Sequence, residues 1–305
     1  MVSGFIVGID GGGTKSEIRI AAQNGDTLFQ FKGGAINLNG TPADVVKTNL
    51  SRILNEACQK IGPLSNCLSM CIGAAGISNP AALSALTEMV RGSGYIGPLK
   101  IVGDFYTALY GALQSSVGII LISGTGSVCY GRNSRNEEHR TGGLGHLLDD
   151  GGSGYAIGRD ILTAVARAED GRGKKTVLTD LLLASYGMKP SDIVPFVYSN
   201  EIEKGKVAAL APMLTDACER NDVTALAIAE KAASELALLV TPLAIRLGLK
   251  EGECAMSGSI LQKDPFIRER FLALISVGLP SLYCRLSKGD AALGAIFLAK
   301  GRLKY

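Results

Sequence analysis

The chain has 305 residues, of which 39 are glycine, and 47% of its residues are hydrophobic. That apolar fraction excludes a disordered chain, and the lack of a Gly-x-y period excludes collagen. With 31 basic and 28 acidic residues the formal net charge is only +3, which argues against a nucleic-acid-binding protein. The length predicts two domains, and the glycine excess indicates tight turns or close backbone contacts inside them.

The first part of the chain alternates strands and helices. Residues 4–10 form an apolar run, and segments 16–22 and 26–31 alternate in polarity, with a hairpin signal at Asn24-Gly25. A helix with Thr41 as its N-cap should follow. We expect helices at 42–61, 80–90 and 104–114, and between them strands at 67–73 and 100–103. This alternation predicts an α/β sheet.

The opening pattern then returns. An apolar strand at 117–123, a Gly-Thr-Gly turn and a strand at 127–131 repeat the first strand–turn–strand unit. We interpret this as an internal duplication, although two unrelated glycine-rich hairpins would look the same. Later elements are helices at 154–170, 176–186, 190–200, 207–220 and 222–248, a strand at 253–259, a helix at 265–275, an edge strand at 282–286 and a helix from 290 capped by Asp290. The expected domains are 1–115 and 116–289, and helix 290–305 is a candidate to return to the first.

The segment Asp-Gly-Gly-Gly-Thr-Lys at 10–15 is the first candidate site. Consecutive glycines let the backbone approach a ligand and turn its N–H groups toward an anion. The spacing matches neither a Walker A loop nor the dinucleotide motif G-x-G-x-x-G. A carboxylate at a strand end, Asp10, suits a hydrated divalent cation. We predict phosphate binding by the residues that follow, which are Gly11, Gly12, Gly13, Thr14 and Lys15.

Three further segments contain candidate residues. The turn Gly124-Thr125-Gly126 repeats the phosphate-binding composition. Asp104 follows a short strand, where it is either a helix N-cap or a carboxylate aimed at a ligand. The loop 142–155 has six glycines and the adjacent pair Asp149-Asp150, which suits hydroxyl recognition. His146 in that loop is more typical of a packed residue than of a catalytic base.

Together these segments fall in one order: DGGGT at 10–14, GAAG at 73–76, Asp104, SGTGS at 123–127, and GGLGH with DDGGSGY at 142–155. The ordered set resembles the N-acetylglucosamine kinase and glucosamine kinase group of the BadF/BadG/BcrA/BcrD ATPase family, within the actin-like ATPase/sugar kinase superfamily. The resemblance spans Asp10 to Gly294. It implies an α/β fold of two ribonuclease-H-like domains, duplicated βββαβαβα units flanking a nucleotide and sugar cleft, with helical insertions in the second domain.

The resemblance also implies residue roles. Asp10 would position Mg²⁺ through water, and Asp104 would be the catalytic base that faces the sugar hydroxyl. The two phosphate loops would be Gly11 to Lys15 and Gly124 to Gly126, and Gly258 would lie beside the adenosine. The implied sugar-binding residues are Asn37, Asp104, Gly143, Leu144, Gly145 and Asp150.

Two departures from the family pattern leave the identity of the sugar substrate undecided. Many relatives have Trp where this chain has Leu144, and Gly-Asp-Glu where it has Asp149-Asp150-Gly151. These changes could alter the contact to the 2-substituent of the sugar. The candidates are N-acetylglucosamine, glucosamine, N-acetylmannosamine and glucose.

We therefore predict a MgATP-dependent kinase that phosphorylates the 6-hydroxyl of an amino sugar, with N-acetylglucosamine as the first candidate. The alternatives are a glucosamine kinase or a broad-specificity hexokinase of the same fold and, from another class, a switch ATPase that activates a partner enzyme. Seven cysteines without a C-x-x-C pair, and no basic leader, indicate a cytoplasmic protein. No apolar run reaches ~18 residues, so we expect no membrane partner. The resemblance implies a homodimer.

Overall fold

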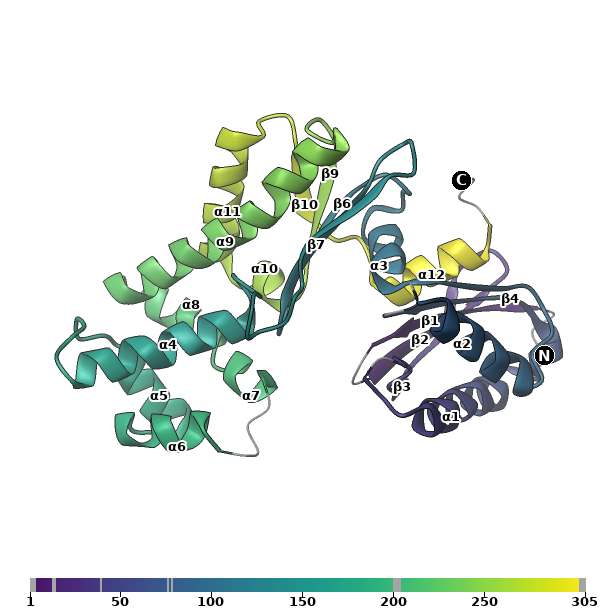
Figure 1. Cartoon of the computed structure of the whole chain (residues 1–305), viewed down its shortest axis with the longest axis horizontal. Helices are drawn as coiled ribbons and strands as arrows, with labels where there is room; N and C mark the ends of the chain where they lie inside the picture. The colour runs from purple at the N-terminus through teal and green to yellow at the C-terminus, as the bar shows by residue number, and fades with distance from the viewer. Residues whose placement is uncertain are drawn as a thin grey trace. The chain divides into compact units, whose positions relative to one another are not determined.

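The computed structural model describes residues 4–12, 15–38, 40–75, 77, 79–199 and 204–301. The chain forms two compact units (Figure 1). Unit 1 consists of Met1–Ser116 and Ser287–Tyr305, and unit 2 consists of Val117–Leu286. Among the described helices, none combines the length and the apolar character that crossing a bilayer requires.

Unit 1 is built on a five-stranded sheet in the order β3-β2-β1-β4-β5. The first three strands pair antiparallel, and β4 and β5 extend the sheet in parallel with β1. The strands are β1 (Phe5–Gly11), β2 (Lys15–Ala22), β3 (Thr27–Gly34), β4 (Cys67–Ala74) and β5 (Leu99–Gly103). The carboxyl ends of three parallel strands therefore meet at one edge, where α/β sheets bind ligands.

Helices cover both faces of this sheet (Figure 1). On one face α1 (Ala43–Ile61) and α2 (Pro80–Gly92) bury apolar side chains against alternate residues of β1, such as Val7 and Ile9. On the other face lie α3 (Asp104–Leu113) and α12 (Ala291–Ala299). The predicted N-cap Thr41 is wrong, because α1 begins one residue later, after Pro42, which has no side chain able to cap.

Glycines bring α12 close to its neighbours in unit 1. A Cβ on Gly294 would overlap the Thr107 carbonyl, and one on Gly111 would overlap the Asp290 carbonyl. A Cβ on Gly8 of β1 would lie 2.6 Å from the Ala292 carbonyl oxygen. These contacts leave no room for side chains, so part of the glycine excess is used for close packing.

Unit 2 repeats the connectivity of unit 1. Its sheet has the order β10-β9-β6-β7-β8, with β6, β7 and β8 antiparallel and β9 and β10 parallel to β6. The strands are β6 (Gly118–Ser123), β7 (Ser127–Arg132), β8 (Glu138–Gly142), β9 (Glu253–Ser257) and β10 (Tyr283–Leu286). The identical strand order confirms the duplication predicted from the two strand–turn–strand units.

A long helical segment separates β8 from β9, as predicted. Its members are α4 (Gly154–Glu169), α5 (Leu178–Tyr186), η2 (Pro190–Asp192), α6 (Ile193–Val197), α7 (Lys204–Ala208), α8 (Pro212–Glu219) and α9 (Val223–Leu247). After β9 follow α10 (Ser259–Lys263) and α11 (Pro265–Gly278). The single helix predicted over 207–220 is wrong, because the chain turns at 209–211 and Pro212 starts a new helix.

Candidate active site

In unit 1, the strand ends bring Asp10 and Asp104 to one edge of the sheet. Asp10 lies opposite Gly73 of β4, and the next residue of β4, Ala74, lies opposite Gly103 of β5. Asp104 follows Gly103 directly. The register therefore places both predicted carboxylates at the ligand-binding edge, although 94 positions separate them in the sequence.

Asp104 begins α3, but it is not the N-cap. Gly103 holds the N-cap position and Asp104 is the first helical residue. One carboxylate oxygen of Asp104 accepts a hydrogen bond from the Phe105 N–H at 3.0 Å, and the Thr107 hydroxyl donates to the Asp104 carbonyl at 2.9 Å. The bond from Phe105 fixes the orientation of this half-buried carboxylate at the strand edge, and the positive end of the helix favours its ionised form.

Negative charge accumulates around Asp10. Burial, and then the charges of Asp104, Glu17 and Asp290, raise the pKa of Asp10 from 3.8 to about 7, while Lys15 lowers it. A divalent cation would relieve this repulsion. Among the described residues no three Asp, Glu, His or Cys side chains form a direct metal cage. The negative charge around Asp10 fits a divalent cation, and Mg²⁺, which keeps most of its water ligands, is commonly bound by one or two carboxylates.

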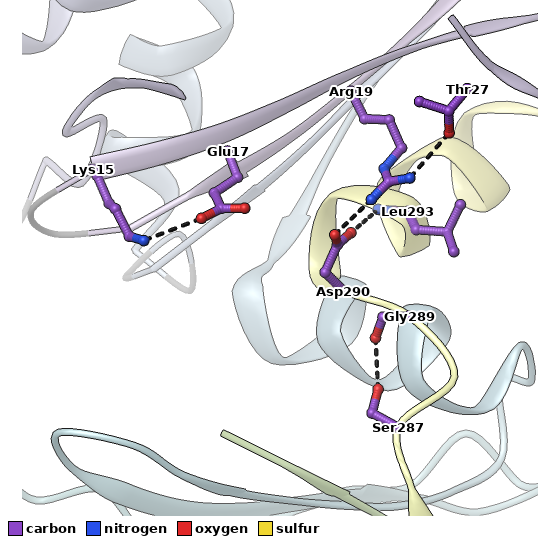
Figure 2. A network of polar contacts seen from close by, with 8 residues as sticks. All are labelled: Lys15, Glu17, Arg19, Thr27, Ser287, Gly289, Asp290 and Leu293. Carbon is purple, nitrogen blue, oxygen red and sulfur yellow. Dashed lines mark hydrogen bonds and ion pairs between the residues drawn. The ribbon is translucent and has the colours of Figure 1, made fainter. Parts of the chain in front are cut away.

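Two cationic side chains of β2 are already paired with carboxylates (Figure 2). Lys15 pairs with Glu17 at 3.1 Å, and Arg19 pairs with Asp290 at 2.6 Å. Asp290 also accepts a hydrogen bond from the Leu293 N–H at 2.8 Å, which confirms it as the N-cap of α12. These pairs offset the charges of Glu17 and Asp290, the two carboxylates that, after burial and Asp104, raise the pKa of Asp10.

The first glycine loop is partly described. A Cβ on Gly11 would overlap the side chain of Ile36, and the Gly12 N–H donates to the Lys15 carbonyl at 3.1 Å. Gly13 and Thr14 lie outside the described residues. The Gly11–Ile36 contact brings the segment that contains Asn37 beside the end of β1, so this predicted sugar-binding residue shares a region with Asp10.

In unit 2, the turn between β6 and β7 is tied to two other segments. The Gly154 N–H donates to the Gly124 carbonyl at 2.7 Å, and the Ser123 hydroxyl donates to the Gly152 carbonyl at 2.8 Å. Gly258 has φ +89°, and a Cβ there would overlap the Ser123 carbonyl. Predicted phosphate-loop and adenosine-side residues, Gly124 and Gly258, are therefore brought together by these contacts.

A cavity of about 520 Å³ opens beside this turn. Gly124 and Thr125 line one side of the cavity, and Ile260 and Lys263 of α10 line another. The break between α7 and α8 forms a largely apolar wall. The lining residues from that break and its flanks are Gly205, Ala208, Ala209, Ala211, Pro212, Thr215 and Asp216. Sequence analysis missed this wall, because it assigned the segment to a continuous helix; Pro212 was the available signal.

The predicted sugar loop combines exposed and buried residues. Leu144 is 61% exposed, and Gly143 is also exposed, whereas Gly145 is half-buried. Asp150 is 4% exposed, and one of its oxygens accepts a hydrogen bond from the Ser127 N–H at 3.2 Å. Asp150 thus ties the loop to the β6–β7 turn.

His146 stacks edge-on against Tyr155, with ring centroids 4.6 Å apart. This agrees with the interpretation of His146 as a packed residue. The same loop contact orients the start of α4, which follows Ser153 as its N-cap.

Comparison with known proteins identifies the family. The sequence profile of the BadF/BadG/BcrA/BcrD ATPase family matches residues 7–299. The chain belongs to this family. Within it, the chain is 32% identical over 300 residues to an N-acetylmuramic acid/N-acetylglucosamine kinase of Clostridium acetobutylicum, with 97% of this chain and 98% of the relative covered. It is 28% identical to an N-acetyl-D-glucosamine kinase of Dictyostelium discoideum, with 97% of each covered.

Solved structures agree with the fold. A proposed N-acetylglucosamine kinase from Chromobacterium violaceum superimposes with a TM-score of 0.74 at 25% identity, covering 98% of this chain and 99% of the other. The predicted resemblance to this BadF/BadG/BcrA/BcrD ATPase group and the predicted two-domain α/β fold are therefore confirmed.

Proposed function

We propose that this member of the BadF/BadG/BcrA/BcrD ATPase family is an ATP-dependent kinase that transfers the γ-phosphoryl group to the 6-hydroxyl of an amino sugar. The observation that carries the proposal is the match over 97% of the chain to a kinase named for N-acetylmuramic acid and N-acetylglucosamine. The two carboxylates at the strand ends of unit 1 and the glycine-lined cavity of unit 2 supply the groups that such a reaction needs.

Asp104 acts as the base in this proposal. Its carboxylate, oriented by the start of α3, orients the sugar hydroxyl and takes its proton as the oxygen attacks phosphorus. Asp10 would hold Mg²⁺ through water, and the ion would supply charge neutralisation on the phosphate oxygens. The turn after β1 would place the loop Gly11, Gly12, Gly13, Thr14 and Lys15 beside the phosphates, with the Gly12 N–H holding the turn closed through the Lys15 carbonyl.

The nucleotide is proposed to occupy the cavity of unit 2. Gly124 and Thr125, followed by Gly126, would contact its phosphates, and the ring would pack between Ile260, two residues after Gly258, and the α7–α8 break. A volume of about 520 Å³ lies in the range of small-molecule sites. Apolar walls with a few polar groups suit a purine and its ribose.

The residues proposed for sugar recognition are Asn37 in unit 1 and, in unit 2, Gly143, Leu144 and Gly145, with Asp150 holding the loop. Leu144 presents a small exposed apolar surface in place of an aromatic ring. Such a side chain leaves room for an N-acetyl group or a bulkier sugar substituent, so N-acetylglucosamine is the first candidate and N-acetylmuramic acid the second.

The test is a coupled ADP-release assay over a panel of sugars. The panel holds N-acetylglucosamine, N-acetylmuramic acid, glucosamine, N-acetylmannosamine and glucose, each with kcat and KM, and the product position is read by NMR. We expect 6-phosphorylation and the highest kcat/KM with an N-acetylated sugar. ADP release that no sugar stimulates would refute the kinase and favour a switch ATPase.

Cytoplasmic location and a homodimer complete the proposal. In the described part of the chain all seven cysteines are free, which suits a reducing compartment. Light scattering on the purified protein tests the dimer, with a mass twice 31.8 kDa expected.

A further inference from the structure

The sugar loop of unit 2 lies along one helix, α9. The Thr141 hydroxyl donates to the Leu239 carbonyl at 2.6 Å. A Cβ on Gly142 would lie 2.7 Å from the Leu239 side chain, and one on Gly152 would lie 2.6 Å from the Ala232 carbonyl oxygen. Successive turns of α9 thus support both ends of the loop.

Gly151 is a different kind of glycine from its neighbour. Gly152 has φ +72°, a conformation that favours glycine, whereas Gly151 has no left-handed φ. An alanine could adopt the backbone of residue 151, but its Cβ would lie 2.7 Å from Glu235 Oε2 and 3.0 Å from Glu235 Cβ. A side chain at residue 151 would therefore require Glu235 of α9 to move, and the contact with its Cβ is the harder one to relieve.

Gly151 connects this contact to the functional turn. The Ser127 hydroxyl donates to the Gly151 carbonyl at 2.7 Å, and the Ser127 N–H donates to Asp150 at 3.2 Å. Gly151, which Glu235 covers, and Asp150 are therefore both bonded to Ser127 at the end of the β6–β7 turn.

Glu235 lies at the edge of a cavity in unit 2. It is half-buried and lines a cavity of about 260 Å³ together with Asp149 and Lys231. The Lys231 ammonium pairs with Asp160 at 2.8 Å instead. Within the described residues Glu235 makes neither an ion pair nor a hydrogen bond, so its contribution to the loop comes from the shape of its side chain.

We propose that Glu235 is a positioning residue for sugar binding: its side chain fills the space over Gly151 and holds the loop 143–150 in its sugar-binding conformation. The inference rests on the proposed function. It assigns a role to a helix residue that neither touches the sugar nor belongs to the glycine motifs.

The test is a set of variants measured for sugar KM, ATP KM, kcat and Tm. Glu235→Ala should raise the sugar KM on the order of tenfold, within the range that a misplacement below 1 Å produces, and leave the ATP KM within about twofold. Glu235→Gln, which has the same shape, should retain most of the wild-type sugar affinity. The matched control is Glu230→Ala on the same helix, whose carboxylate pairs with Arg270 at 3.3 Å, and it should change neither KM.

A double-mutant cycle tests the contact itself. Gly151→Ala should impair sugar binding because of the clash, and in the Glu235→Ala background the same substitution should be much less harmful. Additive effects of the two substitutions would overturn the proposal. So would a Glu235→Ala variant with an unchanged sugar KM, or one whose losses are the same for sugar and ATP.

The proposed function is decided separately, by the wild-type protein. If the wild type turns over no sugar, the kinase proposal fails. The rise in Tm on adding N-acetylglucosamine then still shows whether the loop binds sugar. The role of Glu235 is supported if N-acetylglucosamine raises the Tm of the wild type and of Glu235→Gln, but raises the Tm of Glu235→Ala less. A wild type that turns over no sugar and shows no rise in Tm overturns both proposals, whereas a wild type that turns over sugar without a rise overturns the role of Glu235 alone.

Discussion

Replacing Asp10 by asparagine should stabilise the protein at alkaline pH while it removes activity. In the folded protein burial, and then the charge of Asp104, raise the pKa of Asp10 to about 7, whereas an unfolded Asp titrates near its ordinary 3.8. Between these values the folded state binds a proton that the unfolded state does not. The contribution of Asp10 to the free energy of unfolding is therefore fully present below pH 3.8 and is lost as the pH rises through about 7.

The width of that window gives the magnitude. About three pH units at 1.36 kcal/mol each correspond to about 4 kcal/mol. This is an upper bound, because the side chain is still partly accessible to water, which screens its charge. Asparagine has the same shape and cannot ionise. The stability advantage of Asp10→Asn should grow from near zero at pH 4 to at most about 4 kcal/mol at pH 8.

Thermal unfolding of both proteins from pH 4 to 8.5, without divalent cations, is the assay. One kcal/mol shifts Tm by about 2–4 °C in units of this size, so the difference at pH 8 should reach several degrees. The control is Glu88→Gln, which removes an exposed carboxylate of the same unit. The difference in Tm between this variant and the wild type should not change with pH. Millimolar Mg²⁺ should raise the wild-type Tm at pH 8 more than that of Asp10→Asn. A pH-independent difference, or a less stable Asp10→Asn at pH 8, would refute the assigned charge repulsion.

Three further substitutions test other parts of the molecule. Asp104→Asn should lower kcat by at least about 100-fold and leave the nucleotide Kd within a few-fold, since the loss is of a proton acceptor; a fully active variant in steady-state assays would remove Asp104 from that role. Gly258→Ala should weaken nucleotide binding, measured by calorimetry, because its Cβ displaces Ser123 beside the β6–β7 turn; unaltered affinity would separate Gly258 from the nucleotide. Gly294→Ala should destabilise unit 1 by about 1–3 kcal/mol in chemical denaturation, because its Cβ overlaps the Thr107 carbonyl of α3; an unchanged midpoint would contradict the close packing of α3 and α12.

Local patterns predicted much of the fold. Alternating polarity and glycine-rich turns located both strand–turn–strand units, and their recurrence predicted the duplication that the two identical strand orders confirm. The Asp290 cap was also predictable, because capping depends on a side chain and a backbone N–H three residues apart. The order of the glycine motifs along the chain is by itself sufficient to indicate the family.

Long-range contacts decided the rest. Only the sheet register shows that Asp10 and Asp104 lie at the ends of strands on one sheet edge, and only packing shows that α12 adjoins α3. The cavity wall at the α7–α8 break and the contact of Glu235 with Gly151 were not foreseen. The physical reason is that turns and caps depend on neighbours in the sequence, whereas a space filled by a residue 84 positions away leaves no local pattern.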